Sequence, residues 1–328
     1  MTNAVPQKFI VTGGAGFIGS NLVAALNGRG FRDILIADEL DSELKKANLH
    51  SLRYRKYLDR ADFRNQVLDG RLAPVNTVFH LGACTSTTET NEEYLTDNNF
   101  RFSQELCEWC LKHGMRFIYA SSAATYGDGS RGCSDDDKVT ASLRPLNPYG
   151  KSKQMFDLWA LENGHLSRIV GLKYFNVYGP REDHKGDMRS VVNKAYGQIL
   201  RTGRLELFKS YRPDYHDGEQ ERDFLYVRDA VNVTLFFCDH PELSGLFNCG
   251  TGRARTWLDL GRAVFAAMNR KPRIRFIEMP EAMRDAYQYR TQADITKLRQ
   301  AGYSAPFTSI EEGAKDYVQN HLAKRQPI

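Results

Sequence analysis

Over the first 175 residues, apolar positions form short continuous runs separated by longer amphipathic stretches. The runs are KFIVT (8–12), DILIAD (33–38), NTVFHLG (76–82), RFIYASS (116–122) and SRIVGLKYF (167–175). Because their hydrophobicity is continuous rather than alternating, we expect strands covered on both faces, as in a parallel sheet between helix layers. The stretches 17–28, 99–113 and 149–163 have the length and apolar spacing of crossover helices. The pattern predicts an α/β fold with a doubly wound parallel sheet of the Rossmann type.

The hydrophobic pattern changes after residue 175, where loops rich in Tyr, Gly, Pro and Arg alternate with isolated amphipathic helices. Two of these helices begin with capping-box spacing, at Thr256 to Asp259 and at Ser309 to Glu312. We expect residues 1–175 to form one domain, onto which 222–250 packs back. Residues 176–328 are expected to form a smaller, irregular α/β domain over the carboxyl ends of the strands.

Composition and charge are typical of a globular enzyme. The chain has 328 residues, of which 41% are hydrophobic, so it can bury a large core. No apolar run reaches the roughly 18 residues of a membrane helix, and no signal-peptide pattern opens the chain, so we expect a cytoplasmic protein. The net charge of +5 comes from 45 basic and 40 acidic residues that are interleaved, which argues against a nucleic-acid surface.

The six cysteines give little sign of a metal site. Only Cys107 and Cys110 form a CxxC pair, and they lie inside a helical pattern without a second pair. We therefore expect two buried thiols on one face of a helix and no metal.

A glycine-rich turn follows the first predicted strand. Gly14, Gly16 and Gly19 match G-x-G-x-x-G, and a second register begins at Gly13. Glycines let a pyrophosphate approach the backbone N–H groups at the start of the next helix. Asp38 ends the second strand about twenty residues later, where a carboxylate meets an adenosine ribose. Together these features predict a dinucleotide site in the first domain, and hence a substrate site in the second.

The segment YGKSK places Tyr149 and Lys153 on one face of a predicted helix. An ammonium beside a phenol lowers a pKa that is ordinarily about 10, which predicts Tyr149 as a base at neutral pH. A surface tyrosine beside a solvated lysine is the alternative. Ser122 weakens that alternative, because it ends another predicted strand and offers a hydroxyl to the reacting oxygen. The three side chains predict a hydride-transfer centre.

These motifs carry a family resemblance. TGGAGFIG (12–19), SSAATYG (121–127), YGKSK (149–153) and YFNVYGPRE (174–182) resemble the extended short-chain dehydrogenase/reductase family, whose members act on nucleotide sugars. HLGACTSTTE (80–89), ERDFLYV (221–227), FNCGTGRA (247–254) and YRTQADITKLRQAGY (289–303) closely resemble its ADP-heptose epimerase branch.

The resemblance implies inversion at carbon 6 of an ADP-linked heptose. The route is transient oxidation to a 6-keto intermediate and re-reduction by a tightly bound nicotinamide cofactor. It also implies a homo-oligomer, a pentamer, and a place in heptose supply for the lipopolysaccharide core of a Gram-negative bacterium.

The resemblance also implies roles for single residues. Tyr149 and Lys185 would be two acid-base groups in different places, with Ser122 and Lys153 beside the tyrosine; by itself, Lys185 is typical of a solvated loop lysine. The implied cofactor residues are Gly13, Gly16, Phe17, Ile18, Gly19, Asp38, Glu39, Lys45, Arg60, Leu81, Gly82, Ala83, Cys84, Thr85, Asn98, Lys153, Val177 and Lys185. The implied substrate residues are Ser122, Asn176, Asp187, Lys194, Phe208, Lys209, Ser210, Tyr211, Arg222 and Tyr287.

Arg222 has a physical case of its own, because a guanidinium fork suits a diphosphate. A structural ion pair with Asp223 is the alternative for this residue. Phe208 and Tyr287 are expected either to stack on adenine or to belong to the core.

The choice between NADP and NAD depends on opposing charges. Asp38 and Glu39 favour the free ribose 2′-hydroxyl of NAD. Lys45 and Arg60 stand where the resembling family places lysines on the 2′-phosphate of NADP. We expect NADP, with NAD as the less favoured alternative.

Three other functions compete with the epimerase interpretation. A UDP-hexose 4-epimerase differs only in its sugar-side residues. A nucleotide-sugar dehydratase would carry an acidic pair where this chain has Ala123, Ala124 and Thr125. A non-catalytic, dinucleotide-sensing regulator of the same fold would lack the Tyr149 and Lys153 pair.

Overall fold

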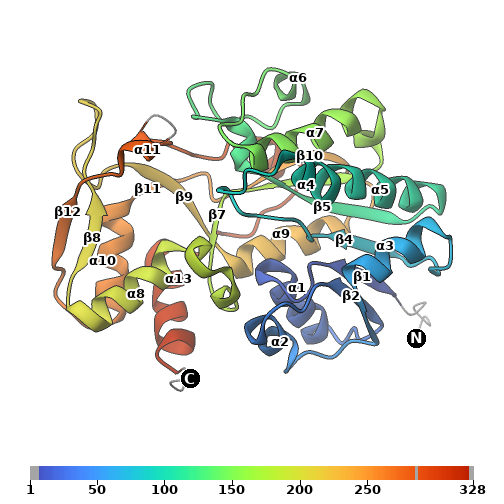
Figure 1. Cartoon of the computed structure of the whole chain (residues 1–328), viewed down its shortest axis with the longest axis horizontal. Helices are drawn as coiled ribbons and strands as arrows, with labels where there is room; N and C mark the ends of the chain where they lie inside the picture. The colour runs from blue at the N-terminus through green and yellow to red at the C-terminus, as the bar shows by residue number, and fades with distance from the viewer. Residues whose placement is uncertain (1–6, 285–286, 325–328) are drawn as a thin grey trace.

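The computed structural model describes residues 7–284 and 287–324. Its main sheet has seven parallel strands in the order β10-β6-β5-β4-β1-β2-β3 (Figure 1). Their bounds are β1 Phe9–Thr12, β2 Ile34–Asp38, β3 Lys56–Asp59, β4 Thr77–His80, β5 Arg116–Ser122, β6 Val170–Tyr174 and β10 Gly245–Cys249. The five runs expected to be strands are β1, β2, β4, β5 and β6.

Helices cover both faces of this sheet, because successive side chains of a strand point to opposite faces. Phe9 and Val11 of β1 pack in one core with α1 and α9, whereas Ile10 packs in another with α3, α5 and α7. The bounds are α1 Phe17–Gly28, α2 Glu43–Leu49, α3 Arg60–Leu68, α5 Phe102–Lys112, α7 Pro148–Glu162 and α9 Val227–Asp239. The predicted doubly wound fold is confirmed.

A third core lies beside the main sheet, at the left of Figure 1. Two small sheets contribute to this region: β11-β9-β7, with β11 Ala254–Thr256, β9 Glu221–Tyr226 and β7 Asn176–Tyr178, and β12-β8, with β12 Ile274–Ile277 and β8 Leu205–Phe208. Its helices are α8 Val191–Thr202, α10 Trp257–Ala267, α13 Ile310–Asp316 and η5 Tyr317–Leu322. The short α11 Glu281–Arg284 follows β12, and α12 Thr296–Gln300 packs on β10 of the main sheet. The division of the chain at residue 175 stays a prediction.

Local sequence signals explain several helix boundaries. α7 begins with Pro148 after Asn147, whose side chain accepts a hydrogen bond from Gly150 N. Both predicted capping boxes are confirmed, at the starts of α10 and α13. α5 starts later than expected because a π-helical turn, η1 Thr96–Arg101, precedes it. The remaining elements are α4 Glu92–Leu95, η2 Ala123–Tyr126, α6 Asp137–Thr140, η3 His165–Ser167 and η4 Asp183–Met188.

Two expectations concern the CxxC pair and the membrane. Cys107 and Cys110 are fully buried in α5, and burial raises the pKa of both thiols. This confirms the prediction of buried helix-face thiols.

No helix in the described ranges is long and apolar enough to span a bilayer.

Candidate active site

The turn between β1 and α1 is tight enough to require glycine. Gly13 has a φ of 67°, and a Cβ there would lie 2.7 Å from Gly82 N. A Cβ on Gly19 would lie 2.1 Å from Gly13 O. Gly16 is the N-cap of α1 and provides no side-chain cap, and no acidic residue follows in the first turn. The first N–H groups of α1 are therefore available to an anion.

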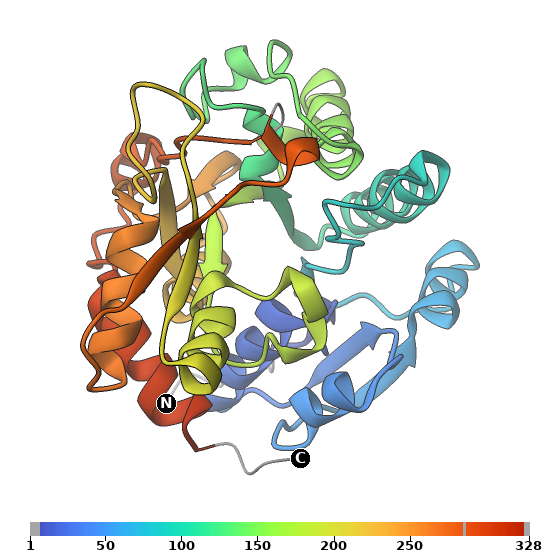
Figure 2. The same ribbon diagram turned by 60° about the vertical axis from the view of Figure 1, so that its left-hand side comes forward.

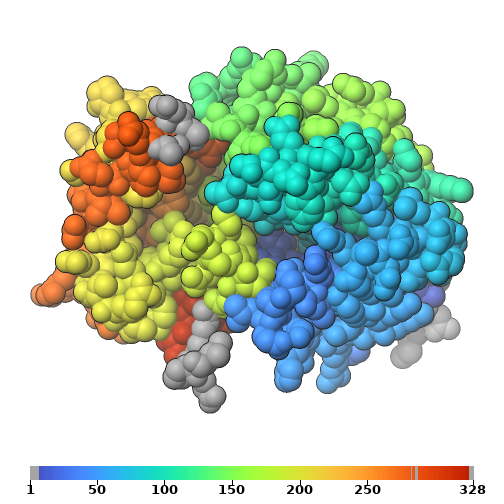
Figure 3. Space-filling model, viewed as in Figure 1, coloured from blue at the N-terminus to red at the C-terminus, as the bar shows by residue number. Residues whose placement is uncertain are grey.

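A cleft of about 630 Å³ lies at the carboxyl ends of the strands, where open α/β sheets bind ligands. The space-filling view shows a hollow between the yellow-green segment around residues 180–200 and the blue N-terminal part (Figure 3). The predicted residues that line this cleft are Gly13, Gly16, Phe17, Ile18, Gly19, Asp38, Lys45, Leu81, Gly82, Ala83, Cys84, Thr85, Ser122, Tyr149, Lys153, Asn176, Val177 and Lys185.

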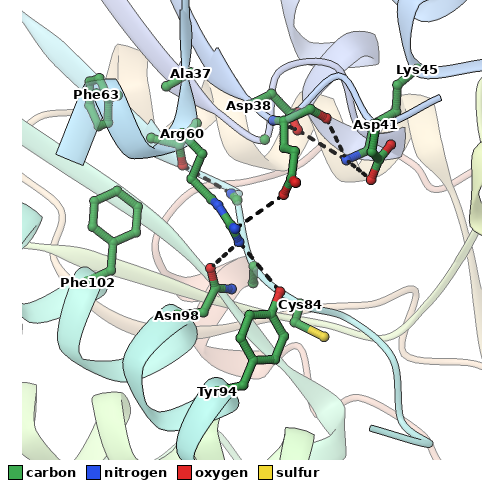
Figure 4. A pocket seen from close by; sticks show the side chains of 15 residues that line it. Ala37, Asp38, Asp41, Lys45, Arg60, Phe63, Cys84, Tyr94, Asn98 and Phe102 are labelled. Atoms are coloured by element: carbon green, nitrogen blue, oxygen red, sulfur yellow. Dashed lines mark hydrogen bonds and ion pairs between the residues drawn. The ribbon is translucent and has the colours of Figure 1, made fainter. Parts of the chain in front are cut away.

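A smaller cavity of about 210 Å³ continues the cleft at the ends of β2 and β3 (Figure 4). It shares Asp38 and Lys45 with the larger cleft, and Glu39, Arg60 and Asn98 also line it. The two predicted cations and the two predicted carboxylates therefore meet in one pocket.

Hydrogen bonds and ion pairs order this pocket. The Asp38 carboxylate accepts hydrogen bonds from Ala15 N at 2.8 Å and Glu39 N at 2.7 Å, and Lys45 Nζ lies 3.3 Å away. Arg60 pairs with Glu39 at 3.2 Å and donates to Asn98 Oδ1 at 2.7 Å (Figure 4). Each cation is thus already balanced by a carboxylate.

The predicted hydride-transfer residues converge from two elements. Ser122 ends β5, whereas Tyr149 begins α7 and Lys153 lies one turn further along. The three side chains line the large cleft, and the Ser122 hydroxyl hydrogen-bonds with Tyr149. Lys153 Nζ donates to Ala120 O at 2.9 Å.

Burial dominates the electrostatics of this pair. It raises the pKa of Tyr149, and the hydrogen bond with Ser122 offsets this only partly. It lowers the pKa of Lys153 to about 8, against the opposing charge of Asp157. The expectation of a lowered pKa for Tyr149 is therefore wrong: burial raises it, and the Lys153 ammonium bonds to a backbone carbonyl.

Lys185 reaches the same cleft from η4, a short irregular segment. Its Nζ lies 5.6 Å from the centre of the Phe17 ring at the start of α1. Burial lowers the pKa of the Lys185 ammonium, and the charge of Glu182 opposes this shift. The side chain is thus not the freely solvated loop lysine of the alternative interpretation.

A single carboxamide joins the Lys185 segment to the dinucleotide turn. Asn48 Nδ2, from α2, lies 3.0 Å from Ala15 O, 3.1 Å from Arg181 O and 3.3 Å from His184 Nδ1. Arg181 returns a hydrogen bond to Asn48 O. The turned view shows the yellow-green Lys185 segment lying against the blue N-terminal elements (Figure 2).

Arg222 is buried, and no acidic side chain in the described ranges pairs with it. Its guanidinium carbon lies 5.6 Å from the centre of the Trp257 ring and 5.3 Å from that of Tyr287, and Nη1 donates to Glu221 O. Asp223 instead accepts hydrogen bonds from Thr251 and from two further backbone N–H groups, those of Gly252 and Ala293. The alternative pair of Arg222 with Asp223 therefore does not form among the described residues, and burial lowers the pKa of Arg222.

The other predicted substrate residues are more dispersed. Lys194, Phe208 and Tyr287 line a further cavity of about 680 Å³, which shares Trp257 with the large cleft. Asp187 is exposed in η4. The structure places Lys209, Ser210 and Tyr211 in the loop after β8, where Lys209 pairs with Glu278 at 2.5 Å, Ser210 N donates to Asp217 and the Tyr211 hydroxyl bonds to Glu278.

Sequence reasoning missed three residues that shape the site. Asn99, rather than its predicted neighbour Asn98, fixes the cofactor-side loop, accepting from Cys84 N and donating to Cys84 O, both at 2.9 Å. In the sequence, the only sign of this role was the pair of adjacent asparagines in DNNF (97–100). Trp257 follows the capping residue of α10 and packs on Arg222, and Asn48 lies in a polar stretch that had no motif.

Comparisons with known proteins agree with this geometry. Residues 9–250 match the NAD dependent epimerase/dehydratase family. The chain is 53% identical over 321 residues to the ADP-L-glycero-D-manno-heptose-6-epimerase of Nitratidesulfovibrio vulgaris (strain DP4), covering 98% of this chain and 99% of that protein.

Solved structures show the same likeness. The Helicobacter pylori ADP-L-glycero-D-manno-heptose-6-epimerase superposes with a TM-score of 0.81 at 27% identity, over 97% of each chain. The UDP-glucose 4-epimerase of Thermus thermophilus in complex with NAD gives 0.77 at 26% identity, over 97% of this chain and 99% of that one. With its glycine turn, its Ser122, Tyr149 and Lys153 centre and these matches, the chain belongs to the NAD dependent epimerase/dehydratase family.

Proposed function

We propose that this chain inverts carbon 6 of the heptose in ADP-D-glycero-D-manno-heptose, giving ADP-L-glycero-D-manno-heptose. One observation carries the proposal: Tyr149 and Lys185, two acid-base groups from different elements, line the same cleft as the dinucleotide turn. The 53% identity to an epimerase of that name supports the choice of sugar over a UDP-hexose. The product would supply heptose for the lipopolysaccharide core.

The cleft fits a nicotinamide dinucleotide. The turn at Gly13 has no room for a side chain, and α1 begins without a side-chain cap, so backbone N–H groups can hold a pyrophosphate. Asp38 is placed for an adenosine ribose. When bound, the nicotinamide supplies a reversible hydride acceptor.

Inversion needs proton transfer at two places, because the carbon 6 oxygen points in different directions in the two half-reactions. Tyr149 Oη takes or returns the proton on one side, with Ser122 hydrogen-bonded to the phenol. Lys185 Nζ does so on the other side. The burial of both groups keeps bulk water from the reacting oxygen.

Lys45 and Arg60 are the ligands that we assign to the 2′-phosphate of NADP. Both line the adenosine pocket, although Asp38 and Glu39 already pair with them. A phosphate would compete with these carboxylates for the two cations. Denaturing the protein as purified and weighing the released dinucleotide by mass spectrometry decides the matter; NAD alone would overturn the assignment.

Arg222 is the residue that we assign to the substrate diphosphate. It is a buried guanidinium that has no carboxylate partner in the described part of the chain and lies between two aromatic rings. Phe208 and Tyr287 line the neighbouring cavity, which suits a nucleobase. The pentamer implied by the family resemblance stays a prediction.

The test is direct. Purified protein should interconvert the two carbon 6 epimers of ADP-heptose without added reductant, as followed by chromatography or proton NMR. UDP-glucose and UDP-N-acetylglucosamine serve as competing substrates. Turnover of a UDP-hexose with no change in ADP-heptose would contradict the proposal.

A further inference from the structure

A buried carboxylate closes the segment that carries Lys185. Glu182 is fully buried, and both of its oxygens accept hydrogen bonds of 2.6 Å from Ser190, one from the backbone N–H and one from the hydroxyl. The Tyr317 hydroxyl also hydrogen-bonds with this carboxylate. Ser190 is the N-cap of α8. These contacts join the two ends of residues 183–189.

The partners of Glu182 require its charge. The N–H and O–H of Ser190 both donate, and Tyr317 also has a hydrogen to give because its oxygen accepts from Asn193. A carboxylate that accepts several hydrogen bonds is favoured in its ionised form. Among the described residues, no basic side chain forms an ion pair with Glu182. Burying a charge without an ion-pair partner costs free energy of folding. We therefore expect the Glu182 carboxylate to serve a function that offsets this cost.

Lys185 is the cation that this charge acts on. Burial lowers the pKa of Lys185, and Glu182 is the group whose charge raises it. Conversely, burial raises the pKa of Glu182, while the hydrogen bonds from Ser190 and the charge of Lys185 lower it. The backbone adds a direct link, because Lys185 N donates to Glu182 O at 3.0 Å.

We propose that Glu182 is a positioning residue for Lys185: its buried carboxylate, bonded at both oxygens to Ser190, fixes the segment that carries the lysine. The charge of the same carboxylate favours the ammonium form of Lys185. This inference rests on the proposed role of Lys185 in epimerisation. It assigns to Glu182 no contact with the substrate.

Other titratable groups share the cleft with Lys185. They are Asp38 from β2, Lys45 from α2, Cys84 from the loop after β4, Tyr149 and Lys153 from α7, Tyr174 from β6, Tyr178 from β7, and His184 and Arg189 near Lys185 itself. Burial lowers the pKa of His184, and the charges of Lys45 and Lys185 lower it further, so His184 adds little positive charge at neutral pH. Glu182 is thus the acidic group whose charge opposes the effect of burial on the pKa of Lys185.

Two variants separate charge from position. Glu182→Gln keeps the shape and one acceptor oxygen for Ser190, but it removes the charge and the second acceptor oxygen. Ser190→Ala keeps the charge and removes one of the two hydrogen bonds. Both variants are purified with their bound dinucleotide and compared with wild type by thermal unfolding.

The first readout needs no substrate. Competitive acetylation with acetic anhydride across pH, quantified by peptide mass spectrometry, gives the pKa of Lys185, with the labelling of exposed Lys194 as internal reference. We expect Glu182→Gln to lower the pKa of Lys185, because the charge that raises it is removed. Ser190→Ala should leave the pKa of Lys185 unchanged. An unchanged value in Glu182→Gln, or an equal fall in both variants, would overturn the electrostatic part.

The second readout is the pH profile of kcat/KM for epimerisation. The limb that belongs to Lys185 should move to lower pH in Glu182→Gln, since loss of a negative charge disfavours the ammonium. Ser190→Ala should lose rate at every pH without moving the limb. Wild type that fails to epimerise ADP-heptose would refute the proposed function, while acetylation would still test the pairing.

Glu182→Asp covers the case in which Glu182→Gln does not fold. It keeps the charge but is one methylene too short to reach both groups of Ser190. We expect a several-fold loss of rate with an unchanged pKa of Lys185. An unchanged rate would overturn the positioning part.

Discussion

Tyr149 and Lys185 reach one cleft from two very different supports. Tyr149 lies in the first turn of α7, a helix of 15 residues with an asparagine cap and Pro148 at its start. Lys185 lies in η4, which departs from helical geometry at Gly186, with a φ of 53°. A long packed helix fixes its side chains through its own backbone hydrogen bonds. The η4 segment instead depends on side chains from other elements, which makes Lys185 the more easily disturbed group.

The largest expected effect comes from Tyr149→Phe. Removing the phenolic hydroxyl takes away the acid-base group and the partner of Ser122. We expect epimerisation to fall by about 10³–10⁴-fold, at the upper end of general acid-base effects. The variant should keep its dinucleotide and melting temperature, because α7 retains its cap and its packing. Activity within tenfold of wild type would remove Tyr149 from the reaction.

Lys185→Met should cost slightly less, about 10²–10³-fold in kcat. The methionine replaces the ammonium, which lies 5.6 Å from the centre of the Phe17 ring, with an uncharged thioether that cannot transfer a proton. Lys151→Met is the matched control, because Lys151 is an exposed lysine of α7 paired with Glu92. Equal activity of the two variants would show that a single acid-base group serves both half-reactions.

Arg222→Met tests the substrate side of the cleft. Loss of a guanidinium that bonds to a diphosphate should raise KM by about 10–100-fold, in keeping with roughly 1.5–3 kcal/mol for hydrogen bonds to charged groups. Stability should change little, because the variant loses the hydrogen bond to Glu221 O but no longer buries a charge. Calorimetric titration with ADP measures the effect, and the exposed Arg228→Met is the control. Unaltered ADP binding would place the diphosphate elsewhere.

The smallest expected effects come from weakening each support in turn, the η4 segment that carries Lys185 and the helix α7 that carries Tyr149. Asn48→Ala removes the donor shared by Ala15 O, Arg181 O and His184, and it should lower the epimerisation rate about tenfold by loosening η4. Asn147→Ala removes the cap of α7 and should cost about 1 kcal/mol of stability with less than a twofold change in rate. Unfolding and steady-state rates on both variants are the measurements. Equal epimerisation rates in Asn48→Ala and Asn147→Ala would mean that the η4 segment and α7 tolerate the loss of a supporting hydrogen bond equally well.

Local features of the site were predictable from the sequence. The glycine turn, Asp38, Ser122 and the Tyr149 and Lys153 pair follow from spacing within one strand-turn-helix unit or one helix. The structure places all of them along one cleft. The edge strand β3 was missed, because it has four residues and exposed ends that carry no apolar run.

Features that join distant segments were not predictable. Asn48 and Arg181 lie 133 residues apart, and no spacing rule connects them. The packing of Arg222 on Trp257 likewise joins β9 to the start of α10. The pKa of Tyr149 is a further case, because helix spacing places Lys153 one turn away but does not predict the burial that raises this pKa.

The sequence by itself determined the doubly wound fold and the glycine turn, and it predicted Tyr149 and Lys185 as the two acid-base groups, because each depends on periodicity, on a short motif or on the likeness of whole segments to a family. Tertiary structure alone decided how Lys185 is held, that Glu182 is buried beside it and that Arg222 has no acidic partner within the described ranges. The physical reason is desolvation. The cost of burying a charge, and the hydrogen bonds that offset it, depend on groups that meet only when the chain has folded.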